Sequence, residues 1–265
     1  MNVFGGVRSV NKGPRGPRGF RGKDSSIIDF CTWLPKTIVK NLQAHDERGC
    51  FFIQNLESDL MRKGKEVQKW VSRSLPGLNL TADKASSEIE KLNDRYVLTF
   101  KEARYSSEEL ALLPNVPKVY GFLCITFRIM TDEEQVLLSD YQEDEEMKNM
   151  GHCEIRVSAN EIILHVRHAT EIIQHSCKDW TTLFIEHNTD EKVAHYRYNV
   201  NGVTGSFVGT SSNYEQDGFA LGSRWDDTFF LNGQIASLEM YWIPSSASLP
   251  EPVKEVIIKN QNIRL

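Results

Sequence analysis

The feature that most constrains the fold is a series of short apolar segments from residue 96 onward, each of strand length and bounded by turn residues. Several alternate apolar and polar residues with a period of two, as half-buried strands do. The candidate strands are residues 96–100, 119–130, 135–139, 153–158, 161–167, 180–187, 195–200, 218–222 and 234–242. No helical segments alternate with them, which disfavours a Rossmann fold or an α/β-barrel enzyme. The segments predict an antiparallel β-sandwich.

Turn-forming residues separate these candidate strands. The predicted turns are Ser158-Ala159-Asn160, Asn188-Thr189-Asp190, Asn201-Gly202 and Asn232-Gly233. Asn-Gly pairs tolerate the left-handed backbone conformation that tight hairpins require. The segment 119–130 is too long and too rich in strand-forming residues for a surface helix, so we expect a strand there.

The first 26 residues differ in composition from the rest of the chain. They hold six basic residues and one acid, a balance of 6 − 1 = +5, so the other 239 residues carry −5 − 5 = −10. Four consecutive Gly-X-Y triplets begin at Gly13, Gly16, Gly19 and Gly22. Only glycine fits the axis where three polyproline-II chains meet, so residues 1–26 are predicted to be a basic, collagen-like arm. The alternative is a flexible arm that binds nucleic acid or other acidic partners.

Residues 27–95 are predicted to be a helical connecting region. Leu34, Ile38, Val39 and Leu42 follow the spacing of one helical face, and Gly49 ends that pattern. Three copies of this helix would clamp the collagen-like triplets in register, or the helix covers the body of its own chain. A second, short helix is expected over residues 82–92. Residues 96–243 would form the sandwich, and residues 244–265 a C-terminal tail that packs on it.

A set of motifs in residues 119–243 follows a recognisable order. A Trp-led strand at Trp180 precedes the run Tyr198-Asn199-Val200-Asn201-Gly202, and closing strands begin at Phe219 and Phe230. This order resembles the concanavalin A-like jelly roll, particularly its laminin G-like branch. The resemblance implies a mainly β, antiparallel two-sheet sandwich. The chain departs from it in an acidic loop at residues 140–146 and in the missing disulfide near the C-terminal end, so ligand binding does not carry over.

The carboxylates offer an incomplete catalytic set. Glycan hydrolysis needs two carboxyl groups at the scissile bond, and hydrolases of this fold place them at alternate strand positions. Glu215-Gln216-Asp217 is the best local match, but Phe219 and Ala220 stand where a third acid is expected. The acidic cluster at residues 140–146 is typical of a solvated loop. We therefore predict that the protein is not an enzyme.

The sequence favours neither a histidine metal site nor a reactive thiol. His165 and His168 are three residues apart, so in a strand they point to opposite faces and share no ion. Five cysteines without a CxxC motif indicate reduced thiols. We expect no cofactor; a calcium ion at the rim is the alternative, with Asn213, Asp217 and Asp227 as its oxygen ligands.

The candidate ligand site combines aromatic and planar polar residues near the last hairpins. A sugar stacks its apolar face on an aromatic ring while amides, carboxylates and guanidinium groups bind its hydroxyls. The candidate binding residues are Trp225, Arg224, Asp226, Tyr214 and Asn201. In the alternative, Trp225 packs beneath its own loop and Arg224 pairs with Asp226 or Asp227.

Two functions fit these features. The first is a homotrimeric recognition or attachment protein, similar in layout to viral fibre and spike proteins, whose head binds a glycan or a cell-surface receptor. The second is a structural or assembly subunit of a virus particle, with its basic arm in a shell or on nucleic acid. The N-terminus lacks an apolar signal core and no segment has the ~18 apolar residues of a membrane span. We therefore expect a virion-associated protein, or alternatively a cytoplasmic one.

Overall fold

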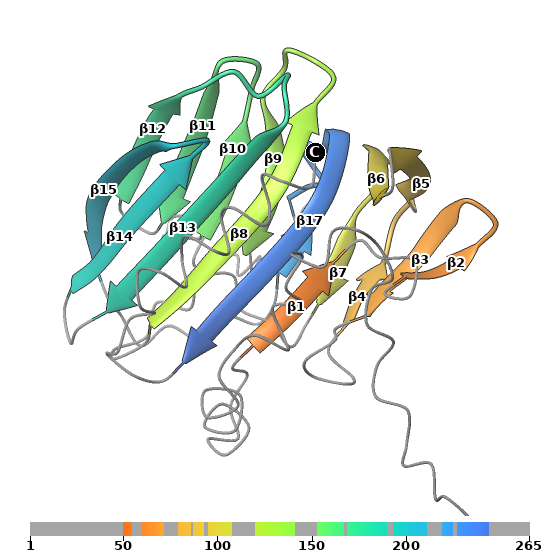
Figure 1. Cartoon of the computed structure of the whole chain (residues 1–265), viewed down its shortest axis with the longest axis horizontal. Helices are drawn as coiled ribbons and strands as arrows, with labels where there is room; N and C mark the ends of the chain where they lie inside the picture. The colour runs from red at the N-terminus through yellow and green to blue at the C-terminus, as the bar shows by residue number, and fades with distance from the viewer. Residues whose placement is uncertain are drawn as a thin grey trace, which may run out of the picture.

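The computed structural model describes residues 50–54, 60–71, 79–85, 87–92, 95–107, 120–140, 153–166, 169–189, 193–210, 219–224 and 227–243. Within these residues every regular element is a β-strand (Figure 1). The strands are β1 (Cys50–Gln54), β2 (Leu60–Lys63), β3 (Glu66–Val71), β4 (Asn79–Ala82), β5 (Ser87–Leu92), β6 (Arg95–Lys101), β7 (Tyr105–Ser107), β8 (Tyr120–Ile129), β9 (Gln135–Asp140), β10 (Cys153–Val157), β11 (Glu161–Val166), β12 (Ala169–Gln174), β13 (Thr181–Thr189), β14 (Val193–Val200), β15 (Val203–Thr210), β16 (Phe219–Leu221) and β17 (Asn232–Ile243).

The strands form two antiparallel layers that are joined along one side. One layer runs β12–β11–β10–β9–β16–β7–β4 and the other β15–β14–β13–β8–β17–β6–β5. Strand β3 pairs with both β4 and β5, so hydrogen bonds continue from one layer into the other. In Figure 1 the layer that contains β13, β8 and β17 lies in front of β10 and β11. The predicted mainly β, jelly-roll-like sandwich is confirmed, and it is nearly closed into a barrel.

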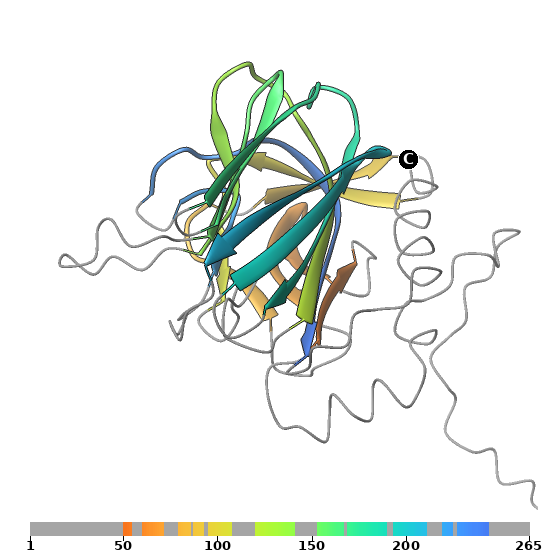
Figure 2. The same ribbon diagram turned by 90° about the vertical axis from the view of Figure 1, so that its left-hand side faces the viewer.

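Side chains close the remaining gap between the edge strands β12 and β15. Tyr198 of β14 donates a hydrogen bond from its hydroxyl to Glu171 of β12, over 3.0 Å. A Cβ on Gly209 of β15 would lie 3.6 Å from the Ala169 side chain, so the two edges are in contact. The strands therefore curve around one common core, as the side view in Figure 2 shows.

The core fills the space between the layers. Its large, fully buried side chains include Trp70, Phe100, Tyr105 and Phe127, which come from strands of both layers. Strand β11 alternates half-buried and buried residues, as a strand with one solvent-facing side does. Strands β8 and β13 are buried along nearly all their length, which explains why residues 119–130 form one long apolar run.

All nine strands predicted from residue 96 onward are confirmed in substance, and none of their ends shifts by more than two residues. The predicted turn at Asn201-Gly202 is also confirmed, with φ values of +47° and +94°. The predicted turn at Asn232-Gly233 is wrong, because both residues begin β17. Gly233 is needed there for a different reason: a Cβ would lie 2.4 Å from the carbonyl oxygen of Arg128 on β8.

The helix predicted for residues 82–92 is wrong. Ala82 ends β4, and residues 87–92 form β5, in which Ser87 and Ile89 face the core while Glu88 and Glu90 face solvent. The alternation has the period of a strand, and the charged residues between the apolar ones disguise it. Strands β2 to β5 also supply Leu60 and Trp70 to the core. The predicted helix that ends at Gly49, the collagen-like triplets and the C-terminal tail at residues 244–265 lie outside the described residues.

No helix in the part of the chain that the structure describes is long and apolar enough to cross a membrane.

Candidate functional site

The loop between β16 and β17 presents an exposed aromatic ring. Phe229 is 42% exposed, and its backbone has φ +53°, a left-handed conformation that bulky residues rarely adopt. The amide of Val136 donates to the Phe229 carbonyl over 2.8 Å, and the amide of Arg224 donates to the Thr228 carbonyl over 3.0 Å. These bonds hold the loop in the conformation that turns the ring outward.

Two arginines flank the ring of Phe229. The guanidinium carbon of Arg224 lies 4.9 Å from the ring centroid and that of Arg156 lies 5.8 Å from it. Both arginines bind one buried carboxylate, Glu154, through Nε at 3.0 Å and 2.5 Å respectively. Glu154 therefore positions both cations, and they position the ring. Arg224 was predicted to bind ligand, or else to pair with Asp226 or Asp227; among the described residues its carboxylate partner is Glu154.

A second ion-pair cluster anchors the other side of this loop. Asp227 binds Arg104 Nη1 and Lys84 Nζ, each at 2.5 Å, and Arg104 Nε also binds Asp83 at 2.9 Å. The hydrogen bond from Lys84, aided by the positive charge of Arg104, holds the pKa of Asp227 below its ordinary value. Because these cations occupy the Asp227 carboxylate, its predicted role as a calcium ligand is not supported.

Phe229 forms one wall of a hollow of about 590 Å³ that we call the Phe229 groove. Its other lining residues are Lys101, Glu102, Thr131, Glu133, Glu134, Gln135, Phe230, Leu231 and Asn232. Gln135 holds two of its loops together: its Oε1 accepts the Asn232 amide over 2.6 Å, and its Nε2 donates to Thr131 Oγ1 and to the Glu133 carbonyl. The groove is therefore shaped before any ligand arrives.

Backbone strain concentrates at this groove. Four non-glycine residues of the described chain have positive φ, and Asn201 among them occupies a tight hairpin turn. The other three are Glu102 and Phe229, which line the groove, and Asp227, which lies two residues before Phe229. Such conformations each cost about 1–3 kcal/mol and cluster at ligand-binding sites. The strained residues therefore lower the stability of the fold while they fix the shape of this surface.

Of the remaining predicted binding residues the structure describes Asn201, which lies in the hairpin turn between β14 and β15. The Asn201 side chain accepts the Thr182 amide over 2.8 Å and donates to the Trp180 carbonyl over 3.1 Å, so it holds the start of β13 against the hairpin turn. Trp225, Asp226, Tyr214, Asn213 and Asp217 lie outside the described residues, as do the carboxylates at residues 143–146. Sequence reasoning missed Phe229, Glu102 and Glu133; the one available signal was the aromatic pair Phe229-Phe230 directly before a strand.

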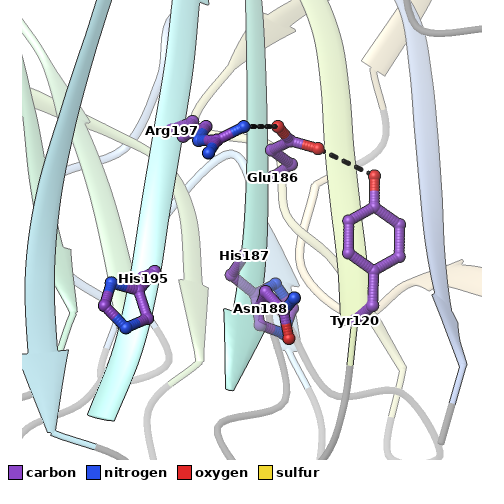
Figure 3. A pocket seen from close by; sticks show the side chains of 6 residues that line it. All are labelled: Tyr120, Glu186, His187, Asn188, His195 and Arg197. Carbon is purple, nitrogen blue, oxygen red and sulfur yellow. Dashed lines mark hydrogen bonds and ion pairs between the residues drawn. The ribbon is translucent and has the colours of Figure 1, made fainter. Parts of the chain in front are cut away.

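A second hollow, of about 250 Å³, lies at the opposite end of β8 and is drawn in Figure 3. We call it the Arg197 pocket; its lining residues are Tyr120, Glu186, His187, Asn188, His195 and Arg197. Tyr120 donates from its hydroxyl to Glu186 Oε2 over 2.9 Å, and Arg197 Nη1 lies 3.8 Å from Glu186 Oε1. The Phe229 groove begins just after the other end of β8, about 30 Å away for a strand of ten residues.

The described residues contain no group of three or more His, Cys, Asp or Glu side chains that is arranged to hold a metal ion. Cys124, Cys153 and Cys177 are buried free thiols. Burial raises the pKa of the Cys177 thiol to about 12, so it is not a nucleophile near neutral pH.

The chain was compared with known proteins. No protein-family model matches it, and no curated protein matches its sequence. Solved structures do match. The binding domain of botulinum neurotoxin serotype D has a TM-score of 0.52 and 10% identity, over 81% of this chain and 51% of that one. A GH54 α-L-arabinofuranosidase soaked with a cyclic sulfate inhibitor has a TM-score of 0.51 and 10% identity, over 75% of this chain and 51% of that one.

This chain spans about half the length of both structures. At 10% identity the likeness shows the fold alone: this is a sheet-rich, jelly-roll-like domain of a kind found both in a toxin's binding domain and in a glycoside hydrolase.

Proposed function

We propose that this protein is a recognition module that binds a saccharide, free or on a cell-surface receptor, in the Phe229 groove and does not transform it. The observation that carries the proposal is the ring of Phe229, which is partly exposed on a strained backbone and held by cation–π contacts with two arginines. An exposed ring in a fixed orientation is what the apolar face of a sugar stacks upon. Backbone strain of this kind is often found at ligand-binding sites, which supports the proposal.

The polar residues around Phe229 suit sugar hydroxyls. Glu102 and Glu133 present carboxylate acceptors, while Lys101 and the side-chain amide of Asn232 present donors. These groups line the same groove as the ring, so one sugar can stack on the Phe229 ring and form hydrogen bonds with these groups at the same time. The fold agrees with this role, because the structures that resemble it include the binding domain of a neurotoxin.

Binding fits the groove better than hydrolysis does. A glycosidase needs one carboxyl group on each side of the scissile bond, and one of the two lies in apolar surroundings that keep it protonated. Glu102 and Glu133 are exposed to solvent, and Glu134 is bound by Arg156 Nη1 at 3.1 Å. No described carboxyl group of the groove has the surroundings of a general acid. A hydrolase assay on any glycan that binds tests this point, and product formation would contradict it.

The decisive experiment is a glycan array probed with wild type, Phe229→Ala and Met61→Ala. Met61 on β2 is 58% exposed, so its truncation is a matched loss of exposed apolar surface. We expect Phe229→Ala to lose its ligands by at least tenfold and Met61→Ala to keep them. Equal binding by Phe229→Ala would exclude the groove as the site.

The proposal extends to a homotrimer that attaches a virus particle to its host through this head. The four Gly-X-Y triplets support it, because a collagen-like stem requires three chains. Three linked groove sites would convert weak single-site binding into strong attachment. Light scattering on the full chain and on a chain that begins at Ser25 tests this part. A trimer that the truncation dissociates is expected; a monomer at all concentrations would contradict it.

A further inference from the structure

The Arg197 pocket is built from neighbouring strands in fixed register. Glu186 of β13 pairs with Arg197 of β14, and Asn188 pairs with His195. Tyr120 of β8 pairs with Asn188 on the other side. Residues two apart on a strand point to the same face, so His195 and Arg197 lie side by side on one face of the sheet, as Figure 3 shows.

The Arg197 side chain has hydrogen-bond donors that its contacts within the described chain do not use. Its side chain is 72% exposed, and within the described chain its one ion-pair partner is Glu186, at 3.8 Å, which is too long for a strong hydrogen bond. A guanidinium group carries five N–H donors in a planar fork that matches an oxyanion. His195 is exposed, and its ring makes no hydrogen bond in the described structure. These two side chains therefore offer unused donors at the same opening.

Glu186 sets the position of Arg197 and leaves its outer edge open. The carboxylate is 9% exposed, and its Oε2 is bound to the Tyr120 hydroxyl. Its negative charge attracts one edge of the guanidinium toward the sheet. Figure 3 shows the guanidinium turned toward Glu186 and the His195 ring farther along the same strand, and the Arg197 side chain stays 72% exposed.

We propose that the Arg197 pocket binds one oxyanion group, a carboxylate or sulfate, of an acidic saccharide. The group forms paired hydrogen bonds with the Arg197 fork, and His195 binds it from the neighbouring position on β14. The pocket volume of about 250 Å³ accommodates such a group with part of the ring that bears it, but not a large ligand. This site is separate from the Phe229 groove, and its ligand class differs from the uncharged sugar face proposed there.

The test follows the Arg197 side-chain N–H signals by nuclear magnetic resonance during titration of the full chain. The probes are the methyl glycoside of glucuronic acid with its carboxylate free, called methyl glucuronate below, the matched uncharged amide of this glycoside, called methyl glucuronamide, and inorganic sulfate. We expect saturable shifts with methyl glucuronate and none with the glucuronamide. In calorimetry, Arg197→Gln is expected to weaken methyl glucuronate binding at least tenfold and Arg197→Lys to an intermediate degree, because lysine lacks the fork. Lys91→Gln removes one exposed positive charge elsewhere and should change nothing.

The outcomes separate the alternatives. Binding of methyl glucuronate that depends on Arg197 supports the proposal, and competition by sulfate extends it to sulfated sugars. Binding of sulfate without methyl glucuronate would overturn the saccharide assignment and leave an inorganic anion site. Equal binding of glucuronate and glucuronamide, or no saturable binding of either, would overturn the whole proposal. None of these results depends on Phe229, so failure here leaves the groove untouched, and the reverse also holds.

Discussion

The Phe229 groove and the Arg197 pocket lie at opposite ends of β8 and are built in different ways. The groove consists largely of loops beyond the strand ends, and positive φ values and long-range ion pairs fix its shape. The pocket sits on paired strands, and sheet register alone brings Glu186 beside Arg197. The groove should therefore depend on residues that support it from behind, whereas the pocket should depend on the residues that line it. The predictions below test this difference.

The largest effect is expected at Glu154, behind the groove. Its side chain is only 4% exposed and binds both arginines that flank Phe229. Glu154→Ala would leave two partly buried guanidinium groups without their shared anion, so we expect it to lower the free energy of unfolding by about 3 kcal/mol. It should also abolish binding in the groove while sparing the pocket. Urea denaturation measures the stability, and a stability equal to wild type would show that the arginines do not need Glu154.

The second effect is expected within the pocket. Tyr120→Phe removes the hydroxyl that donates to Glu186 Oε2 but keeps the buried ring. Losing a hydrogen bond to a largely buried carboxylate should lower the free energy of unfolding by about 1–2 kcal/mol. Groove ligands should bind as in wild type. Thermal and urea denaturation, paired with groove binding, check this; a loss of groove binding would mean that the two ends of β8 are coupled.

Much of the fold could be predicted from the sequence, because the apolar residues of many strands keep a recognisable spacing. Strand β8 is a long apolar run, and burial alternates regularly along β11. Strands β3 and β5 were missed because polar or charged residues, Glu66, Gln68, Glu88 and Glu90, occupy exposed positions and resemble a charged linker. Short strands with charged outer faces have too few apolar positions to show a period.

Much less of the candidate site could be predicted from the sequence. In the sequence Phe229 belongs to a short apolar segment that resembles part of a strand. A phenylalanine gives no local sign that its φ is positive. Its conformation depends on Val136 and Gln135, about 95 residues earlier in the chain, and on Glu154, which meets Arg224 across 70 residues. Arg224 was predicted as a ligand-binding residue, and its contacts with Glu154 and Phe229 follow only from the tertiary structure.

A third, smaller effect separates stability from binding in the groove. Phe229→Asn removes the ring but places a residue that tolerates left-handed backbone conformations at φ +53°. Relief of about 1 kcal/mol of strain offsets the lost contacts with Arg224 and Arg156, which are each worth about 0.5–1 kcal/mol. We expect the free energy of unfolding to stay within about 1 kcal/mol of wild type while glycan binding is lost. A drop of several kcal/mol would mean that the ring serves stability, and the strain would then not report on function.

The smallest effect concerns the charge that anchors the groove loop. Because Lys84 and Arg104 hold the pKa of Asp227 below its ordinary value, its ionised form stabilises the fold above the ordinary aspartate pKa. That contribution is lost as the pH falls through the lowered pKa. Asp227→Asn should therefore be slightly less stable than wild type at neutral pH, and the difference should vanish in acid below that lowered pKa. Since Asp227 is exposed, salt should also shrink the difference. Urea denaturation across pH at low and high salt measures both, and a difference that persists in acid would assign the effect of Asp227 to loop shape instead of charge.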